Sequence, residues 1–251
     1  MNLYADHIPF LNTETDRKLV AKFYSDSECV RVPLSTIEKV RGALPSGPKL
    51  WLDATFDGFP DVDFGSERQS NWAKSIQLVA DAGRFSEPNF LAQPDESVVA
   101  AVVSTVLADA LAHAPDWLSI PQLPHLDGVD YNKINRSLAR AAAKFLDDAN
   151  FRGTRILPVV FTHQRQLNQK TQRNAKIKLI EKLLELAGAR SVWAVDSSLA
   201  DQSATAKFET ERFPGIIAFH AELRDAIELE RVVAGPYWGL NLVLWARELV
   251  D

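Results

Sequence analysis

The sequence has one cysteine, Cys29, among its 251 residues. A single cysteine excludes an internal disulfide framework and a zinc site built from several cysteines. The first residues have neither a basic start nor a long apolar core, so we expect no signal peptide there. The longest apolar stretch is interrupted by Asp109 and is too short to cross a bilayer. These absences predict a soluble, cytoplasmic protein.

An excess of positive charge is also missing, because the formal net charge is −5. A chain of this charge has no global field that draws it to nucleic acid or membranes, so such contacts require a local patch. The glycine-rich patterns of phosphate loops, GxGxxG and GxxxxGK[ST], are absent as well. We therefore predict no nucleotide cofactor from motifs.

Short apolar runs do alternate with longer helical patterns, which is typical of βα units around a parallel sheet. We expect strands at residues 3–6, 30–32, 50–53, 117–120, 156–161, 192–195, 216–219 and 232–234. Eight such units predict an α/β fold, a single (β/α)8 TIM-type barrel forming one domain over residues 1–251. A further apolar run at residues 89–92 leaves an open, doubly wound parallel sheet as the alternative.

Four of the five histidines directly follow runs that are expected to be strands. Strand carboxyl ends meet at the mouth of a barrel, where barrel enzymes keep their active sites. Asp53 and Asp196 are expected at the tips of the third and sixth strands. We predict catalytic roles for Asp53, Asp196, His220 and His163, and substrate contacts from His7, Glu222, Tyr237, Trp238 and Gly235. For the remaining member of the four, His125, a plain loop role is expected.

Carboxylates and histidines at one mouth favour general acid–base catalysis, since neighbouring charges separate their pKa values into donor and acceptor. The expected substrate is a polar small molecule, a sugar or a nucleoside or nucleotide, and the expected reaction is glycosyl-type hydrolysis or transfer. The same residues could hold a divalent metal, which gives a metal-assisted hydrolase as an alternative. The first hypothesis needs no cofactor.

Basic residues gather in two consecutive helical patterns, at residues 133–144 and 165–178. Lys133, Arg136 and Arg140 recur at intervals of three and four, which places them on one helix face. Lys170, Arg173 and Lys176 follow at intervals of three in the next helical pattern. If the two stripes lie side by side, they could follow a nucleic-acid backbone. A nucleic-acid-binding or assembly protein on a barrel scaffold is therefore a further alternative.

Overall fold

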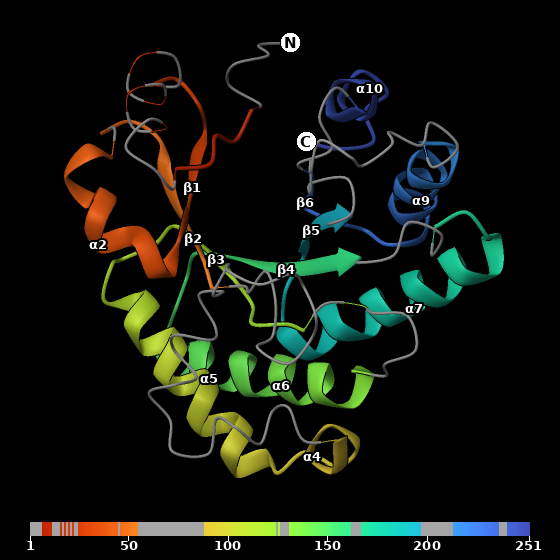
Figure 1. Cartoon of the computed structure of the whole chain (residues 1–251), viewed down its shortest axis with the longest axis horizontal. Helices are drawn as coiled ribbons and strands as arrows, with labels where there is room; N and C mark the ends of the chain where they lie inside the picture. Colours follow the sequence, from red (N-terminus) through yellow and green to blue (C-terminus); the bar gives the residue numbers. More distant parts are fainter. Residues whose placement is uncertain are drawn as a thin grey trace.

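A computed structural model shows an α/β fold around one parallel sheet (Figure 1). It describes residues 7–11, 16, 18, 20, 22, 25–44, 46–54, 88–123, 125, 131–161, 167–196, 213–235 and 240–251. The strands are β1 (Cys29–Pro33), β2 (Lys49–Asp53), β3 (Trp117–Ser119), β4 (Thr154–Phe161), β5 (Ser191–Asp196) and β6 (Arg231–Ala234). They lie in the order β1-β2-β3-β4-β5-β6, and every neighbouring pair is parallel.

Helices connect the strands and cover the outside of the sheet (Figure 1). The short turns η1 (Leu34–Thr36), α2 (Ile37–Val40) and η2 (Arg41–Ala43) follow β1. The longer helices are α5 (Glu96–Leu111), α6 (Asn132–Asp148), α7 (Lys170–Ala187) and α9 (Phe213–Ala226), with the shorter α4 (Pro88–Ala92) and α10 (Leu240–Ala246). Asp95 caps α5 by accepting from the backbone N–H groups of Ser97 and Val98. Helix α7 ends at Ala187 and is capped by Gly188, whose φ of 58° lies in the left-handed region that favours glycine.

The sheet is strongly curled, because its first and last strands come within reach of each other. Six strands laid flat would separate β1 from β6 by roughly 24 Å, five spacings of about 4.8 Å. Glu28, directly before β1, instead accepts two hydrogen bonds from Arg231 of β6, at 2.6 and 2.9 Å. The sequential strand order and this contact are typical of the wall of a β-barrel.

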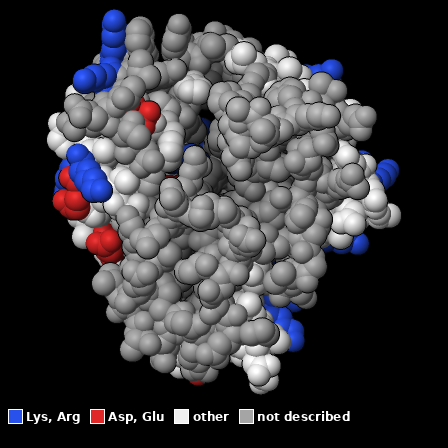
Figure 2. All heavy atoms as spheres, viewed as in Figure 1, with Lys and Arg blue, Asp and Glu red and all other residues white. Residues whose placement is uncertain are grey.

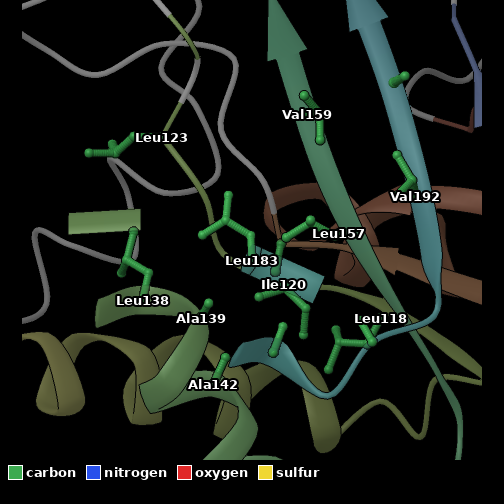
Figure 3. Packing of buried hydrophobic residues seen from close by; sticks show 14 of the residues in the cluster. Leu118, Ile120, Leu123, Leu138, Ala139, Ala142, Leu157, Val159, Leu183 and Val192 are labelled. Carbon is green, nitrogen blue, oxygen red and sulfur yellow. The ribbon is translucent and has the colours of Figure 1, made fainter. Parts of the chain in front are cut away.

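The outer face of the curled sheet is aliphatic and holds the main core. Leu118, Leu157 and Val192 alternate along their strands with inward residues and pack against α6 and α7 (Figure 3). The helices contribute the matching side chains, including Leu138, Ala139 and Leu183. Burial of this aliphatic surface is the main force that holds the helices on the sheet.

The inner face has a different composition. Trp51, Trp117 and Trp193 gather there with Cys29, Ile156, Val195 and Val233 in a second buried cluster. Trp51 and Trp193 meet edge to face at 5.4 Å, and Trp51 and Trp117 lie 6.1 Å apart, between ring centroids. Burial raises the pKa of the Cys29 thiol, which keeps it protonated. Tryptophan thus fills the space that the curl of the sheet encloses.

Two further segments flank the open side of the sheet. Residues 9–11 run parallel to β1, with the Leu11 N–H donating to the carbonyl of Arg31 and the Arg31 N–H to that of Pro9. Across the gap, the Asp251 N–H donates to the carbonyl of Val232 on β6. We call the gap between residues 9–11 and residues 250–251 the seam.

The predicted α/β class is confirmed, and strands lie at six of the eight predicted positions. The prediction for residues 216–219 is wrong, because these residues form the middle of α9. Residues 89–92 belong to helix α4, and the sequential strand order differs from that of a doubly wound sheet, which reverses part-way. The expected strand at residues 3–6 lies outside the described residues, so a full eight-stranded barrel is not shown.

Candidate functional site

A cavity of about 290 Å³ opens in the seam, on the inner face of the sheet. Its floor is formed by Arg31 of β1, Trp51 of β2 and Trp193 of β5. Its two sides come from His7, Ile8 and Phe10 and from Gly235, Asn241, Leu242 and Trp245. In the direction of view of Figure 1, the surface has a hollow in which some atoms of Lys or Arg are visible (Figure 2). We call this cavity the seam pocket.

Arg31 is the central polar residue of the seam pocket. Its guanidinium carbon lies 4.2 Å from the ring centroid of Trp193 and 4.4 Å from that of Phe10, so both contacts are cation–π interactions. Its Nε lies 4.0 Å from Oδ2 of Asp53, at the outer limit of an ion pair. The two rings hold the guanidinium beside the cavity.

Asp53 ends β2 and is 5% exposed. The alternation along the strand puts Asp53 on the same face as Trp51, which donates from Nε1 to Oγ of Ser119 at 2.9 Å. The sequence LWLD therefore places a tryptophan and a carboxylate on the inner face and two leucines on the other. Asp53 reaches the pocket through its contact with Arg31.

Gly235 forms part of the opposite wall, directly after β6. Its φ of 93° is one that side-chain-bearing residues rarely adopt, and its N–H donates to the carbonyl of Ala194. Its own carbonyl accepts from Nε1 of Trp193 at 2.8 Å, which fixes the indole ring against the wall. Gly235 therefore holds an aromatic side of the pocket in place.

The rim carries two further titratable side chains. Partial burial lowers the pKa of His7, so its imidazole is neutral near pH 7 and able to accept a proton. Asp251 is held by Arg224 at 2.8 Å and also accepts from the Val232 N–H. The side-chain charge of Asp251 is therefore paired with that of Arg224. His7 lies on the exposed side of the pocket.

A second cavity of about 280 Å³ lies at the other end of the seam, toward the strand amino termini. Glu28 there accepts from Arg231 and from Lys49, the latter at 3.2 Å. Arg231 also lies 4.7 Å over the ring of Trp117. At this end of the seam, Glu28 is paired with both Arg231 and Lys49, which indicates a structural role.

The structure brings three of the predicted site residues to this region: His7 and Gly235 line the seam pocket, and Asp53 contacts its arginine. Asp196 ends β5, and its side chain lies outside what the structure describes. His163, Tyr237 and Trp238 are also outside the described residues. The catalytic and binding roles assigned to all these residues remain predictions.

The positional argument for His220 fails, because this residue belongs to α9 and follows no strand. It is fully buried beside Phe219, and burial lowers its pKa to about 3. His125, at the end of the segment after β3, packs against Phe161 and has its pKa lowered to about 3 by the same cause. Both imidazoles are neutral core residues at physiological pH.

Glu222 is likewise on α9, where it forms an ion pair with Arg173 of α7 at 2.8 Å. Hydrogen bonds from Arg173 lower the pKa of Glu222. Arg173 also donates to the carbonyls of Leu167 and Asn168, and the absence of a Cβ at Gly215 lets α9 approach these two carbonyl-bearing residues. Arg173 therefore fastens α9 to the start of α7.

This contact corrects the expected basic surface. Helices α6 and α7 do pack side by side, but Arg173 is 8% exposed and faces α9. Arg140 is engaged by Glu96 of α5 at 2.7 Å. Lys133, Arg136 and Lys170 are exposed and Lys176 is partly buried, so the two stripes are less continuous than predicted. Binding of nucleic acid stays a prediction.

Metal binding also stays a prediction. Within the described part of the chain, no three His, Cys, Asp or Glu side chains are grouped closely enough to hold an ion. The same part contains no helix that is long and apolar enough to cross a membrane.

The sequence analysis missed Arg31, Trp51, Trp193 and Trp245. A usable signal was present in the strands themselves, since CVRVP, KLWLD and SVWAVD each place a large polar or aromatic residue between aliphatic ones. The period of two assigns those residues to one face and the aliphatic residues to the other. The sequence analysis assigned these runs to strands but did not assign their residues to the two faces of the sheet.

No protein-family model matches the chain, and no curated protein matches it. Among solved structures, it is similar to 2,3-dimethylmalate lyase, described as a member of the PEP mutase/isocitrate lyase superfamily. The match has a TM-score of 0.44 and 8% sequence identity, over 97% of this chain and 81% of the other. A likeness at this level gives no information about activity, so the function has to be argued from the site.

Proposed function

We propose that this protein is an enzyme whose active site is the seam pocket, where it performs acid–base chemistry on a small polar molecule. The observation that supports the proposal most is the contrast between the two faces of one sheet. The outer face is filled by aliphatic side chains, whereas the inner face borders a cavity with an arginine, a histidine and tryptophans. Convergent polar groups in an otherwise apolar pocket are the usual form of a ligand site.

Asp53 is the candidate proton acceptor. Its carboxylate is almost fully buried at a strand carboxyl end, where barrel-type enzymes place catalytic groups. Arg31 contacts Asp53 and lines the cavity, so it can hold the carboxylate and a bound substrate in one geometry. His7, neutral near pH 7, supplies a second group that can exchange a proton at the rim.

The proposal is tested by incubating the purified protein with a pooled small-molecule extract and following all components by mass spectrometry. We expect the wild type to consume a small set of compounds. Asp53→Asn keeps the shape of the side chain and removes its proton-accepting charge, so consumption should fall at least ~100-fold, the scale of a general base. Asp147→Asn, which changes an exposed carboxylate paired with Arg155, is the matched control and should be fully active.

Thermal unfolding of each variant establishes that it is folded at the assay temperature. The proposal is overturned if folded Asp53→Asn consumes the same compounds at the wild-type rate. It is equally overturned if the wild type changes no compound in the extract.

A further inference from the structure

We infer that the seam pocket binds a small molecule by a flat aromatic ring, and that contacts with the rings and apolar side chains of the pocket select this class of ligand. The inference rests on the proposed function, because it assigns a substrate class to the same pocket. Four observations support it: the hydrogen bonds of two tryptophans, the angle between their rings, the apolar rim and the volume of the cavity.

Trp51 and Trp193, which form part of the floor, use their polar atoms inside the protein. Nε1 of Trp51 donates to Oγ of Ser119 at 2.9 Å, and Nε1 of Trp193 donates to the carbonyl of Gly235 at 2.8 Å. The indole N–H is the one hydrogen-bonding group of a tryptophan side chain. These two side chains therefore offer a ligand their carbon surface, which favours an apolar ring over a group that needs hydrogen bonds.

The angle between these two rings suits a flat ligand. Trp51 and Trp193 stand at 87° to each other, with ring centroids 5.4 Å apart. Aromatic pairs prefer edge-to-face or offset-stacked arrangements. A flat ring that stacks on one of the two indoles is therefore edge-to-face with the other. The hydrogen bonds of both indoles hold them in this arrangement before a ligand arrives, which lowers the entropic cost of binding.

The rim of the pocket is apolar as well. The large hydrophobic side chains that are exposed in the described part of the chain are Phe10 at 39%, Leu242 at 54% and Val243 at 40%. Phe10 and Leu242 line the seam pocket from opposite sides, whereas Val243 is not among its lining residues. Exposed apolar side chains that gather at a cavity indicate a ligand that covers them.

A sugar, the other ring-shaped ligand expected from the sequence, fits this lining less well. Each hydroxyl group that a sugar buries needs a hydrogen-bond partner. The two indoles of the floor donate within the protein, and Asp251 is paired with Arg224 and accepts from the backbone of Val232. An aromatic ring makes no such demand, so we expect the pocket to prefer it.

The volume of the cavity sets the size of the ligand. It is about 290 Å³, at the lower end of the ~300–1,000 Å³ found for ligand pockets. One ring or two fused rings with a short substituent can be enclosed in this space. The ligand is therefore a single small molecule rather than a segment of a polymer.

Isothermal titration calorimetry with neutral probes tests the inference. 2-Naphthol and decahydro-2-naphthol share a skeleton and a hydroxyl group, but only the first is flat and aromatic. Methyl β-glucopyranoside represents the sugars. We expect 2-naphthol to bind at least about tenfold more tightly than either of the other two, because each aromatic pair adds to the effect of the buried area.

Variants at the rim locate the binding. Phe10→Leu keeps an apolar side chain without a ring, so it should weaken binding of 2-naphthol by about threefold, the effect of one aromatic pair, whereas Phe10→Tyr should retain the affinity. Leu242→Ser should weaken binding of 2-naphthol too. Val243→Ser is its matched control, since the two residues are neighbours on α10 and both are exposed. It should bind 2-naphthol as the wild type does.

Equal affinity for the two naphthols would overturn the aromatic class, and so would a glucoside that binds as tightly as 2-naphthol. Failure of 2-naphthol to bind, or equal effects of Leu242→Ser and Val243→Ser, would overturn the inference as a whole. None of these results touches the proposed function, since loss of compound consumption in Asp53→Asn is measured without these probes.

Discussion

The two faces of the curled sheet come from the same six strands and differ in almost every chemical respect. The outer face presents leucine, valine and alanine to the helices, and its members are nearly all fully buried. The inner face presents three tryptophans, a serine, two arginines and an aspartate beside Cys29, Ile156, Val195 and Val233, and it borders the seam pocket. Alternation along each strand produces both faces at once, so a single strand contributes to stability on one side and to chemistry on the other.

This contrast separates two kinds of substitution. A change on the outer face removes packing that every molecule needs in order to fold, whether or not ligand is present. A change on the inner face alters a surface that is partly lined by cavity, where fewer packing contacts are lost. We therefore expect stability and ligand binding to respond to different residues of the same strands.

The largest effect on stability is expected for Leu157→Ala on the outer face of β4. Leu157 is fully buried, and removing its side chain should reduce the free energy of unfolding by about 3 kcal/mol, within the ~2–5 kcal/mol seen for such truncations. Urea denaturation measures the change. At a temperature where the variant is folded, it should consume the same compounds as the wild type at the same rate. A tenfold loss of this activity in the folded variant would show that the two faces are not independent.

The next largest effect concerns acid and the buried histidine of α9. The pKa of His220 is about 3 in the folded protein, against about 6.5 when exposed, so the unfolded chain takes up a proton first as the pH falls. The stability that depends on neutral His220 is complete above pH 6.5 and decreases below it. Between pH 6.5 and 5 the loss should be on the order of 2 kcal/mol.

Denaturation of the wild type and of His220→Gln at both pH values measures this loss. We expect the pH-dependent decrease to be smaller in the variant by about the same 2 kcal/mol, although the variant is less stable at pH 7. Identical decreases in both proteins would contradict a low pKa for this residue. The expected difference between the two proteins would show that this loss of stability at low pH comes from the layer of helices rather than from the pocket.

A smaller effect on stability is expected for Trp193→Phe on the inner face. The variant keeps a ring in place and loses the 2.8 Å hydrogen bond to the carbonyl of Gly235, a change of about 1 kcal/mol. Binding should respond more strongly than folding, since the ring also contacts Arg31 and lines the pocket. Calorimetry and denaturation on the same sample compare the two effects. An affinity equal to that of the wild type would remove Trp193 from the site.

Much of the fold was predictable from local patterns, and the exceptions have physical reasons. The strands at residues 156–161 and 192–195 are continuous apolar runs, which is what a sheet with both faces buried requires. The run at residues 216–219 was mistaken for a strand because four consecutive apolar residues fit either structure. The buried residues Ile216, Phe219, His220 and Leu223 recur at intervals of three and four, and this helical period was visible in the sequence.

The site was predictable only in part. Asp53 was found because it ends a strand, and this depends on local sequence alone. Arg31 and Trp193 are far apart in the chain and become neighbours only because the sheet curls. No local pattern carries the curvature of a sheet, so their meeting could not be read from residue spacing. Glu222 and Arg173 illustrate the opposite case. Glu222 was expected at the barrel mouth and Arg173 on an exposed basic stripe, but the two form an ion pair that joins α9 to α7.

The claim that the inner face of the sheet carries the functional site is tested most directly by a nuclear magnetic resonance titration. Backbone amide and tryptophan indole N–H resonances would be recorded while a compound that the wild type consumes is added. The account predicts that the largest shifts fall on the indoles of Trp51 and Trp193 and on the amides of Phe10 and Gly235, while amides of α6 and α7 remain unchanged. Shifts confined to the outer helices, or no shifts at all, would contradict it.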